Sequence, residues 1–191
     1  SLPEKARKLL SFTDNRQDAA LQSGHFNDFV QVCLLRSGLY QALAHSQSSQ
    51  IQFDALTQAV FDALDLPKRI YAADPDVKYQ AKENTEKALR DVLGYRLYHD
   101  LRRGWRVTSP NLEQCGLLEI EYPWLEDICQ DEDLWSELHQ ILVTADPDTR
   151  YQISKTLLDY MRRELAIKVE YLDQNYQDRI AQASYQYLLQ P

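Results

Sequence analysis

Apolar residues recur along most of this chain at intervals of three or four, which is the period of an α-helix with one buried face. Asp14 or Asn15 can cap a helix that runs to about residue 44, with a possible break near Gly24. Its apolar stripe consists of Phe26, Phe29, Val30 and Cys33. The same spacing predicts helices over 56–64, capped by Asp54, and over 77–103, 134–142 and 149–189.

Two places depart from the helical period. Residues 7–13 are a short apolar run ending in Phe and Thr, which predicts a buried strand. Residues 105–108 and 117–122 predict a pair of short strands, and the second shows partial alternation of apolar and acidic residues. We therefore expect a mainly α, helical bundle-like domain with one short N-terminal strand and one small β-hairpin-like element.

Composition supports a folded domain. Of the 191 residues, 44% are hydrophobic and 26% are charged, close to the average for globular proteins. No apolar run is long enough to span a membrane, and no secretory leader is present, so we expect a cytoplasmic protein without a membrane partner. The three cysteines lack paired spacing, which argues against a disulfide framework or a zinc site. Met161 is the sole methionine, so we expect an excised part of a larger chain.

Charge is unevenly distributed. The net charge is −8, and the stretch 107–149 contains eleven Asp and Glu but no Lys or Arg. Such a stretch is typical of a solvated acidic surface, and it could also serve as a docking surface for a protein partner.

Motifs that mark self-sufficient enzymes are absent from the sequence. It has no GxxxxGK[ST] phosphate loop, GxGxxG fingerprint, HExxH motif or GxSxG elbow. The acidic triplet 131–133 fits a helix start better than a metal site, and the four histidines have no Ser or Cys partner visible in the sequence. We expect no catalytic, cofactor-binding or metal-binding residues in this fragment.

The opening segment, 8–20, reads KLLSFTDNRQDAA. It resembles motif IV of DEAD/DEAH-box helicases of superfamily two, and the wording SFTDNRQDAA is closest to large bacterial helicases of the Lhr and MrfA type. Residues 105–118 are also similar to the segment after motif IV in such proteins. The resemblance implies that 1–45 is a partial RecA-like domain, a strand with its following helix, and that 46–191 is a helical accessory or insertion domain.

In that family the end of the motif IV strand touches the nucleic-acid backbone. The resemblance therefore implies nucleic-acid contacts for Thr13, Asn15 and Arg16, with Phe12 packed beneath them. A helix N-terminus favours anions, which is compatible with such contacts. Alternatively, the residues at 14 and 15 only cap the helix and Arg16 is solvated. The family's Walker A lysine, DExH box and QxxGRxGR motif do not occur in the chain.

A second candidate surface follows the long helix predicted at 77–103. Five arginines lie around Trp105, with tyrosines nearby, and arginine beside an aromatic ring suits single-stranded nucleic acid. The residues are Arg90, Arg96, Arg102, Arg103 and Arg106, with Tyr95 and Tyr98, and Tyr71, Tyr79 and Trp124 as possible extensions. The alternative is that the arginines pair with Asp91, Asp100 and the acidic stretch while Trp105 is in the core.

Two functions are consistent with the sequence. The first is an accessory region of an ATP-dependent helicase that contacts or guides a nucleic-acid strand, with DNA favoured, beside the rest of the parent chain. The parent would use ATP and Mg²⁺, by resemblance, and the fragment alone would not hydrolyse ATP. The second is a protein–protein interaction module that uses 107–149 as its docking surface.

Overall fold

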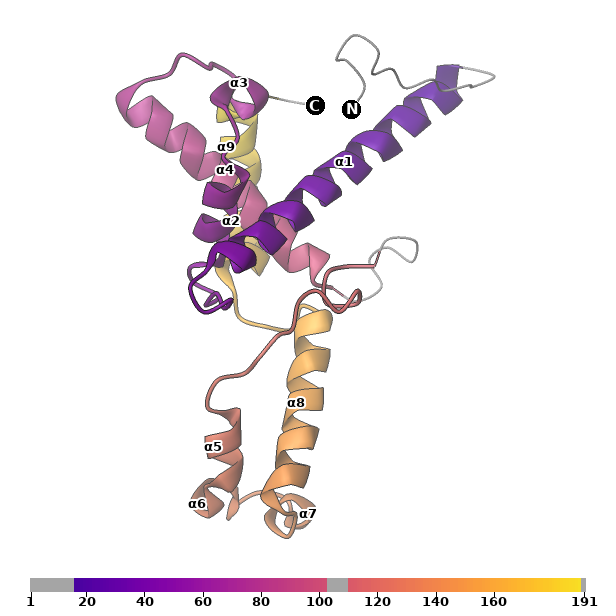
Figure 1. Ribbon diagram of the computed structural model, residues 1–191, viewed down its shortest axis with the longest axis vertical. Helices are drawn as coiled ribbons and strands as arrows, with labels where there is room; N and C mark the ends of the chain where they lie inside the picture. The colour runs from indigo at the N-terminus through magenta and orange to yellow at the C-terminus, as the bar shows by residue number, and fades with distance from the viewer. Residues whose placement is uncertain (1–15, 103–109, 190–191) are drawn as a thin grey trace. The chain divides into compact units, whose positions relative to one another are not determined.

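The computed structural model describes residues 16–102 and 110–189, with side chains from residue 28 onward. Its contacts divide the chain into two compact units, 1–34 and 35–191, and each is described by itself. The described residues are mainly helical, which confirms the predicted fold class (Figure 1).

The longest element is α1, Arg16–His45, which begins in the first unit and ends in the second. It is continuous through Gly24, so the possible break does not occur. In the first unit, Phe29, Val30 and Cys33 of the predicted apolar stripe are exposed. The described part of that unit is this one helix, so it contains no second element on which the stripe could pack.

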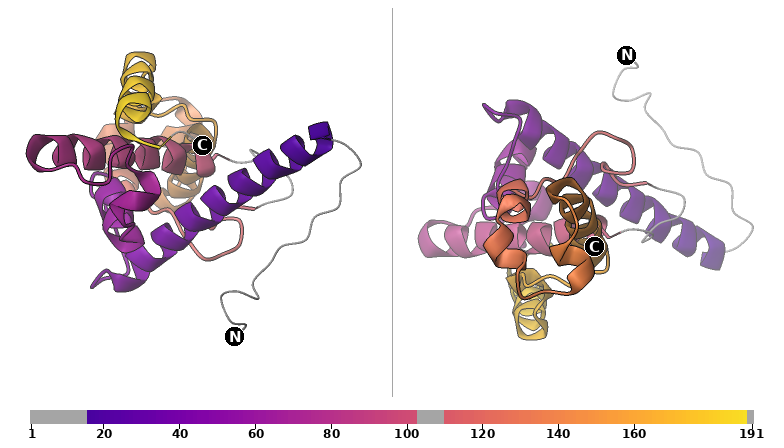
Figure 2. Two further views of the ribbon diagram at one scale, coloured as in Figure 1. Left: turned by 90° about the horizontal axis from the view of Figure 1, so that it is seen from above. Right: turned by 90° about the horizontal axis from the view of Figure 1, so that it is seen from below.

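In the second unit, the main core joins α2 (Leu56–Leu64), α4 (Tyr79–Asp100), α9 (Gln174–Tyr187) and the last turns of α1. Val60 and Leu97 are fully buried at its centre. Leu188, just after α9, forms an isolated antiparallel bridge with Ala72, which directly follows α3 (Lys68–Tyr71). Figure 2 shows α4 and α9 side by side from above and below.

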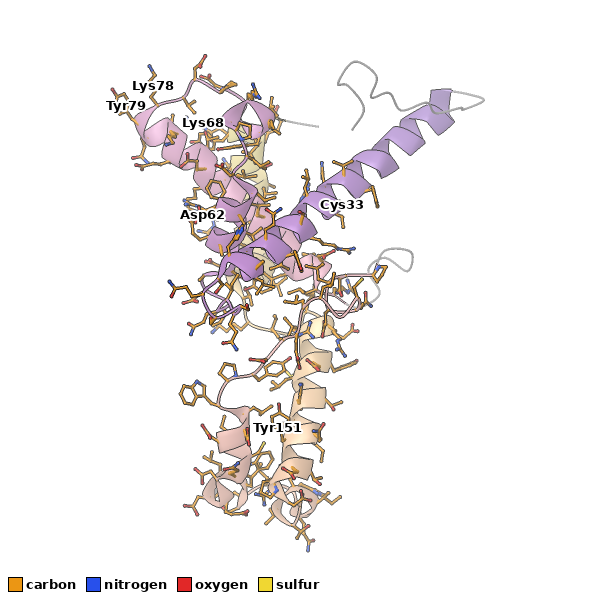
Figure 3. The ribbon with its side chains drawn as sticks, in the orientation of Figure 1. Cys33, Asp62, Lys68, Lys78, Tyr79 and Tyr151 are labelled. Atoms are coloured by element: carbon orange, nitrogen blue, oxygen red, sulfur yellow. The ribbon has the colours of Figure 1, made fainter. Side chains whose placement is uncertain are left out.

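A smaller core in the same unit forms between α5 (Leu125–Gln130), α6 (Glu132–Trp135), α7 (Gln140–Val143) and α8 (Pro147–Arg163). Its buried residues are Leu125, Cys129 and Trp135, against which Leu142, Tyr151 and Leu158 pack. Tyr151 lies on the side of α8 that faces α5 (Figure 3).

Close packing also requires a glycine within α4. A Cβ atom at Gly94 would lie 2.5 Å from Cε1 and Cζ of Tyr171, far inside van der Waals contact. Tyr171 belongs to the 3-10 helix η2 (Glu170–Leu172) and stacks on Tyr98 at 5.7 Å between ring centroids. The missing side chain at 94 therefore allows η2 to pack against α4.

Several helix boundaries differ from the predictions. The helix predicted over 149–189 is two helices, because Leu165 has a positive φ of 58° and Asp173 caps α9 by accepting from the Tyr176 N–H. The helix predicted at 134–142 is divided into α6 and α7, and His139 caps the second. Asp54 does not cap α2, whose N-cap is Ala55.

The prediction of a hairpin-like element is wrong for the part of it that the structure describes. Residues 117–122 form no strand, although Leu118, Ile120 and Tyr122 are half-buried and the glutamates between them are exposed. The alternation thus marks a chain lying on a surface, and no described strand pairs with it. Both the predicted partner at 105–108 and the N-terminal strand at 7–13 lie outside the described residues.

Candidate nucleic-acid interface

The predicted nucleic-acid-binding residues fall into two groups in separate units. In the first unit, Thr13 and Asn15 lie outside the described residues, and Arg16 is the first residue of α1. In the second unit, Arg102 is exposed just after α4. The remaining three, Arg103, Trp105 and Arg106, lie outside the described residues.

Arg36 and Asp100 hold the residues on both sides of 103–109. Asp100, whose side chain is 6% exposed, accepts from Arg36 Nε at 2.9 Å and from Arg36 Nη2 at 2.7 Å. Arg36 Nη1 also donates to the Pro110 carbonyl at 2.7 Å, and Asn111 Nδ2 donates to the Asp100 carbonyl at 3.0 Å. The end of α4 and the chain at 110–111 are therefore fixed by the same two residues.

Next to this pair, His99 is half-buried, and its buried Nε2 has no hydrogen-bond partner in the part of the chain that the structure describes. Burial lowers the pKa of His99, and the nearby charge of Arg102 lowers it further. Tyr95 contacts the same ring, with 4.3 Å between centroids. His99 is consequently neutral at pH 7, and it adds no positive charge to this end of α4.

Most of the aromatic residues that were predicted to lie beside these arginines are either buried or far from them. Tyr98 and Tyr71 are buried, so their faces are not open for base stacking. Tyr79 is exposed, but it begins α4, and 22 helical residues put it about 33 Å from the opposite end. Figure 3 shows Lys78 and Tyr79 at that far end. Trp124 is also exposed, at the N-cap of α5.

In the part of the chain that the structure describes, Arg90 and the two aspartates named in the alternative each have another partner. Arg90 donates to the Gln58 side chain at 2.8 Å and lies over the Phe61 ring. Asp91 pairs with Lys87 at 2.7 Å, and Asp100 pairs with Arg36. Among the described residues, Arg102 is the only arginine of this candidate surface that lies just after the C-terminal end of α4.

Part of the acidic stretch is used inside the fold. Glu113 accepts from Arg162 at 2.6 Å and from Arg163 at 3.0 Å. Arg150 is buried, donates to both carboxylate oxygens of Glu132, and also donates to three backbone carbonyls. We did not predict a structural role for these arginines from the sequence. The only indication was that Arg150 is the first basic residue after the stretch 107–149, which contains no Lys or Arg.

The described residues contain no group of three or more His, Cys, Asp or Glu that could hold a metal ion. In the same residues, no helix is both long and apolar enough to cross a membrane.

Comparison with known proteins gives no further assignment. No protein family matches the sequence, and no curated protein or solved structure was found to be similar to it. The fold defines a mainly α protein.

Proposed function

We propose that this chain is an accessory helical region of an ATP-dependent nucleic-acid helicase of superfamily two, which contacts or guides a strand without hydrolysing ATP itself. The observation that carries the proposal is the order of the opening segment: the motif IV-like residues 8–20 lead into a 30-residue helix that begins at Arg16. Motif IV needs that order, since its polar residues act where a strand ends and a helix begins.

The described end of α4 supports a second contact. Arg102 is exposed, and in the sequence it is followed at once by Arg103, Trp105 and Arg106. The anchor between Arg36 and Asp100 fixes the residues on both sides of this segment. Arginines bind phosphates, and an indole ring stacks on bases, so a segment of this composition suits a single strand without sequence preference.

The test is a titration of labelled single-stranded DNA at several salt concentrations. We expect weak binding that falls steeply with salt. Replacing Arg102, Arg103 and Arg106 with Ala should reduce the slope of log K against log salt by about 2, since each phosphate contact on a single strand contributes about 0.7.

A matched control removes the same charge elsewhere. The exposed residues Arg69, Lys78 and Lys168, changed together to Ala, should leave the slope nearly unchanged. Equal losses in the two triple variants would show general electrostatic attraction and would overturn the assignment of this segment. ATP hydrolysis by the isolated chain would overturn the proposal as a whole.

The second candidate function, a protein-interaction module that docks through 107–149, keeps support from acidic residues at the surface. Glu126, Asp127 and Glu137 are exposed, and no ion pair to a described residue holds them. Binding of the chain to a protein partner that is unchanged when the three arginines are replaced, together with no strand binding, would favour this candidate.

A further inference from the structure

An exposed tryptophan with an unusual backbone conformation stands at the start of α5. Trp124, the N-cap residue, has a φ of 70°, in the left-handed region that bulky residues rarely adopt. The residue is 75% exposed, so burial of its ring does not explain why a tryptophan occupies this position. Outliers of this kind cluster at functional sites, where another requirement outweighs the strain.

Three further residues share this face of α5. Counted from Trp124, Asp127, Ile128 and Asp131 lie three, four and seven residues along the chain, which is the spacing of one helical face. The Ile128 N–H donates to the Trp124 carbonyl at 2.9 Å. The Asp131 N–H donates to the Asp127 carbonyl at 3.2 Å, so both cap residues keep the helical register. The buried residues of α5 lie on another side, in the smaller core.

The face combines apolar surface with negative charge. Ile128 is 44% exposed, and Asp127 and Asp131 are exposed as well. Neither aspartate forms an ion pair with a residue that the structure describes. No Lys or Arg occurs in 107–149, and Arg150, the first cation after that stretch, is buried. The charge next to the indole is therefore acidic.

This charge distinguishes between possible occupants. The two aspartates repel the phosphates of a nucleic-acid strand, which argues against Trp124 as part of a strand-binding surface. A second copy of the chain, docked through the same face, would bring carboxylates against carboxylates, and like charges disfavour that pairing. An arginine of a partner protein matches the face instead. Its planar guanidinium stacks on an indole ring and donates two parallel hydrogen bonds to a carboxylate.

We propose that the face of α5 formed by Trp124, Asp127, Ile128 and Asp131 is a docking site for a segment of a partner protein that carries arginine beside an apolar residue. The indole and the isoleucine supply the contact area, and the two carboxylates set the preference for a guanidinium group. This inference rests on the second candidate function, the protein-interaction module, and names its anchor and the chemistry of its partner.

The probe for the test is a fluorescent peptide of about ten residues in which Arg and Leu alternate. Two control peptides of the same length carry Lys or Glu in place of each Arg. Fluorescence anisotropy with the full chain measures binding. The Arg peptide should bind about threefold or more tightly than the Lys peptide, since an ammonium group lacks the planar fork of a guanidinium. The Glu peptide should not bind, because the face repels it.

The first variant removes the indole. Trp124→Gly leaves the backbone unstrained, because glycine adopts a positive φ without cost. It should weaken binding of the Arg peptide by about tenfold. Tyr185→Ala is the matched control: Tyr185 is 79% exposed on α9, and its loss should leave binding unchanged. Circular dichroism of both variants checks that the helices persist.

The second variant removes the charges and keeps the shape. Asp127→Asn with Asp131→Asn should weaken binding of the Arg peptide by about fivefold and reduce its advantage over the Lys peptide. Asparagine at 131 retains an oxygen that accepts from the Asp133 N–H, so α6 keeps its cap. Asp62→Asn with Asp178→Asn removes two exposed charges elsewhere and should change binding by less than about twofold.

Several results would overturn the docking site. They are equal binding of the Arg and Lys peptides, equal effects of Trp124→Gly and Tyr185→Ala, and no binding of the Arg peptide. Labelled single-stranded DNA that binds Trp124→Gly less tightly than wild type would assign the tryptophan to the strand. A dimer in sedimentation that Trp124→Gly dissociates would assign the face to a second copy.

The site and the proposed functions fail separately. The variant in which Arg102, Arg103 and Arg106 are replaced should bind the Arg peptide like wild type, so loss of strand binding does not affect this test. Binding of the Arg peptide that persists in Trp124→Gly would refute this site and still leave a protein-interaction module elsewhere in 107–149.

Discussion

Replacing Asp100 with Asn should strongly destabilise the second unit, because it removes one charge from an ion pair that is largely out of water. The Asp100 side chain is 6% exposed and that of Arg36 is 14% exposed. Asparagine keeps the shape and one acceptor oxygen, so Arg36 retains one bond to residue 100 and its bond to the Pro110 carbonyl.

The magnitude can be worked out from the burial of the pair. Breaking a buried ion pair by removing one partner costs about 3–5 kcal/mol, and the remaining amide oxygen places Asp100→Asn near the low end, at about 3 kcal/mol. Arg36→Met leaves the carboxylate without its main partner and should cost about the same. Changing both together, to Met and Leu, should return the free energy of unfolding to within about 1 kcal/mol of wild type.

Urea unfolding followed by far-UV circular dichroism measures these free energies, and the slope m should be unchanged. Lys82→Ala is the control: Lys82 is exposed and lies 3.5 Å from the half-buried Glu86, and this i,i+4 pair should contribute less than about 0.5 kcal/mol. Single variants that cost less than about 1 kcal/mol, or a double variant with the summed cost, would refute the reasoning.

Two further predictions concern α4. Gly94→Ala should destabilise, because the clash with Tyr171 costs about 1–3 kcal/mol and exceeds the gain of about 1 kcal/mol in helix propensity. In a Tyr171→Ala background the same change should stabilise, and urea unfolding that shows one sign in both backgrounds contradicts this packing. His99 has a lowered pKa in the folded state, so protonation favours unfolding and stability should fall as the pH drops below about 6.5. His99→Gln should lose that part of the pH dependence when urea midpoints at about pH 7.5 and pH 5 are compared, and an unchanged dependence rules out His99 as its source.

Prediction from the sequence succeeded where periodicity decides local structure. The helices at 16–45, 56–64 and 79–100 lie within a few residues of their predicted bounds. The predicted last helix shows where periodicity fails. Ile153, Leu157 and Met161 form a regular apolar stripe, which normally marks the buried face, yet they are exposed. The buried residues of α8 are Arg150 and Arg162.

The candidate site shows the same division. Its composition, arginines around Trp105, is evident in the sequence, and so is the motif IV-like opening. Whether Tyr98 is open or buried depends on η2, which lies far along the chain and packs on α4 only because position 94 has no side chain. No local pattern contains that information.

The sequence by itself determined the mainly α class, the main helices and the acidic stretch, because helix formation depends on neighbours three and four residues apart. Only the tertiary structure decided which charges are structural. Arg36 pairs with Asp100, which is 64 residues away along the sequence, and Glu113 pairs with Arg162, which is 49 residues away. Such pairs form where packing excludes water from both partners at once, and that exclusion is a property of the assembled core.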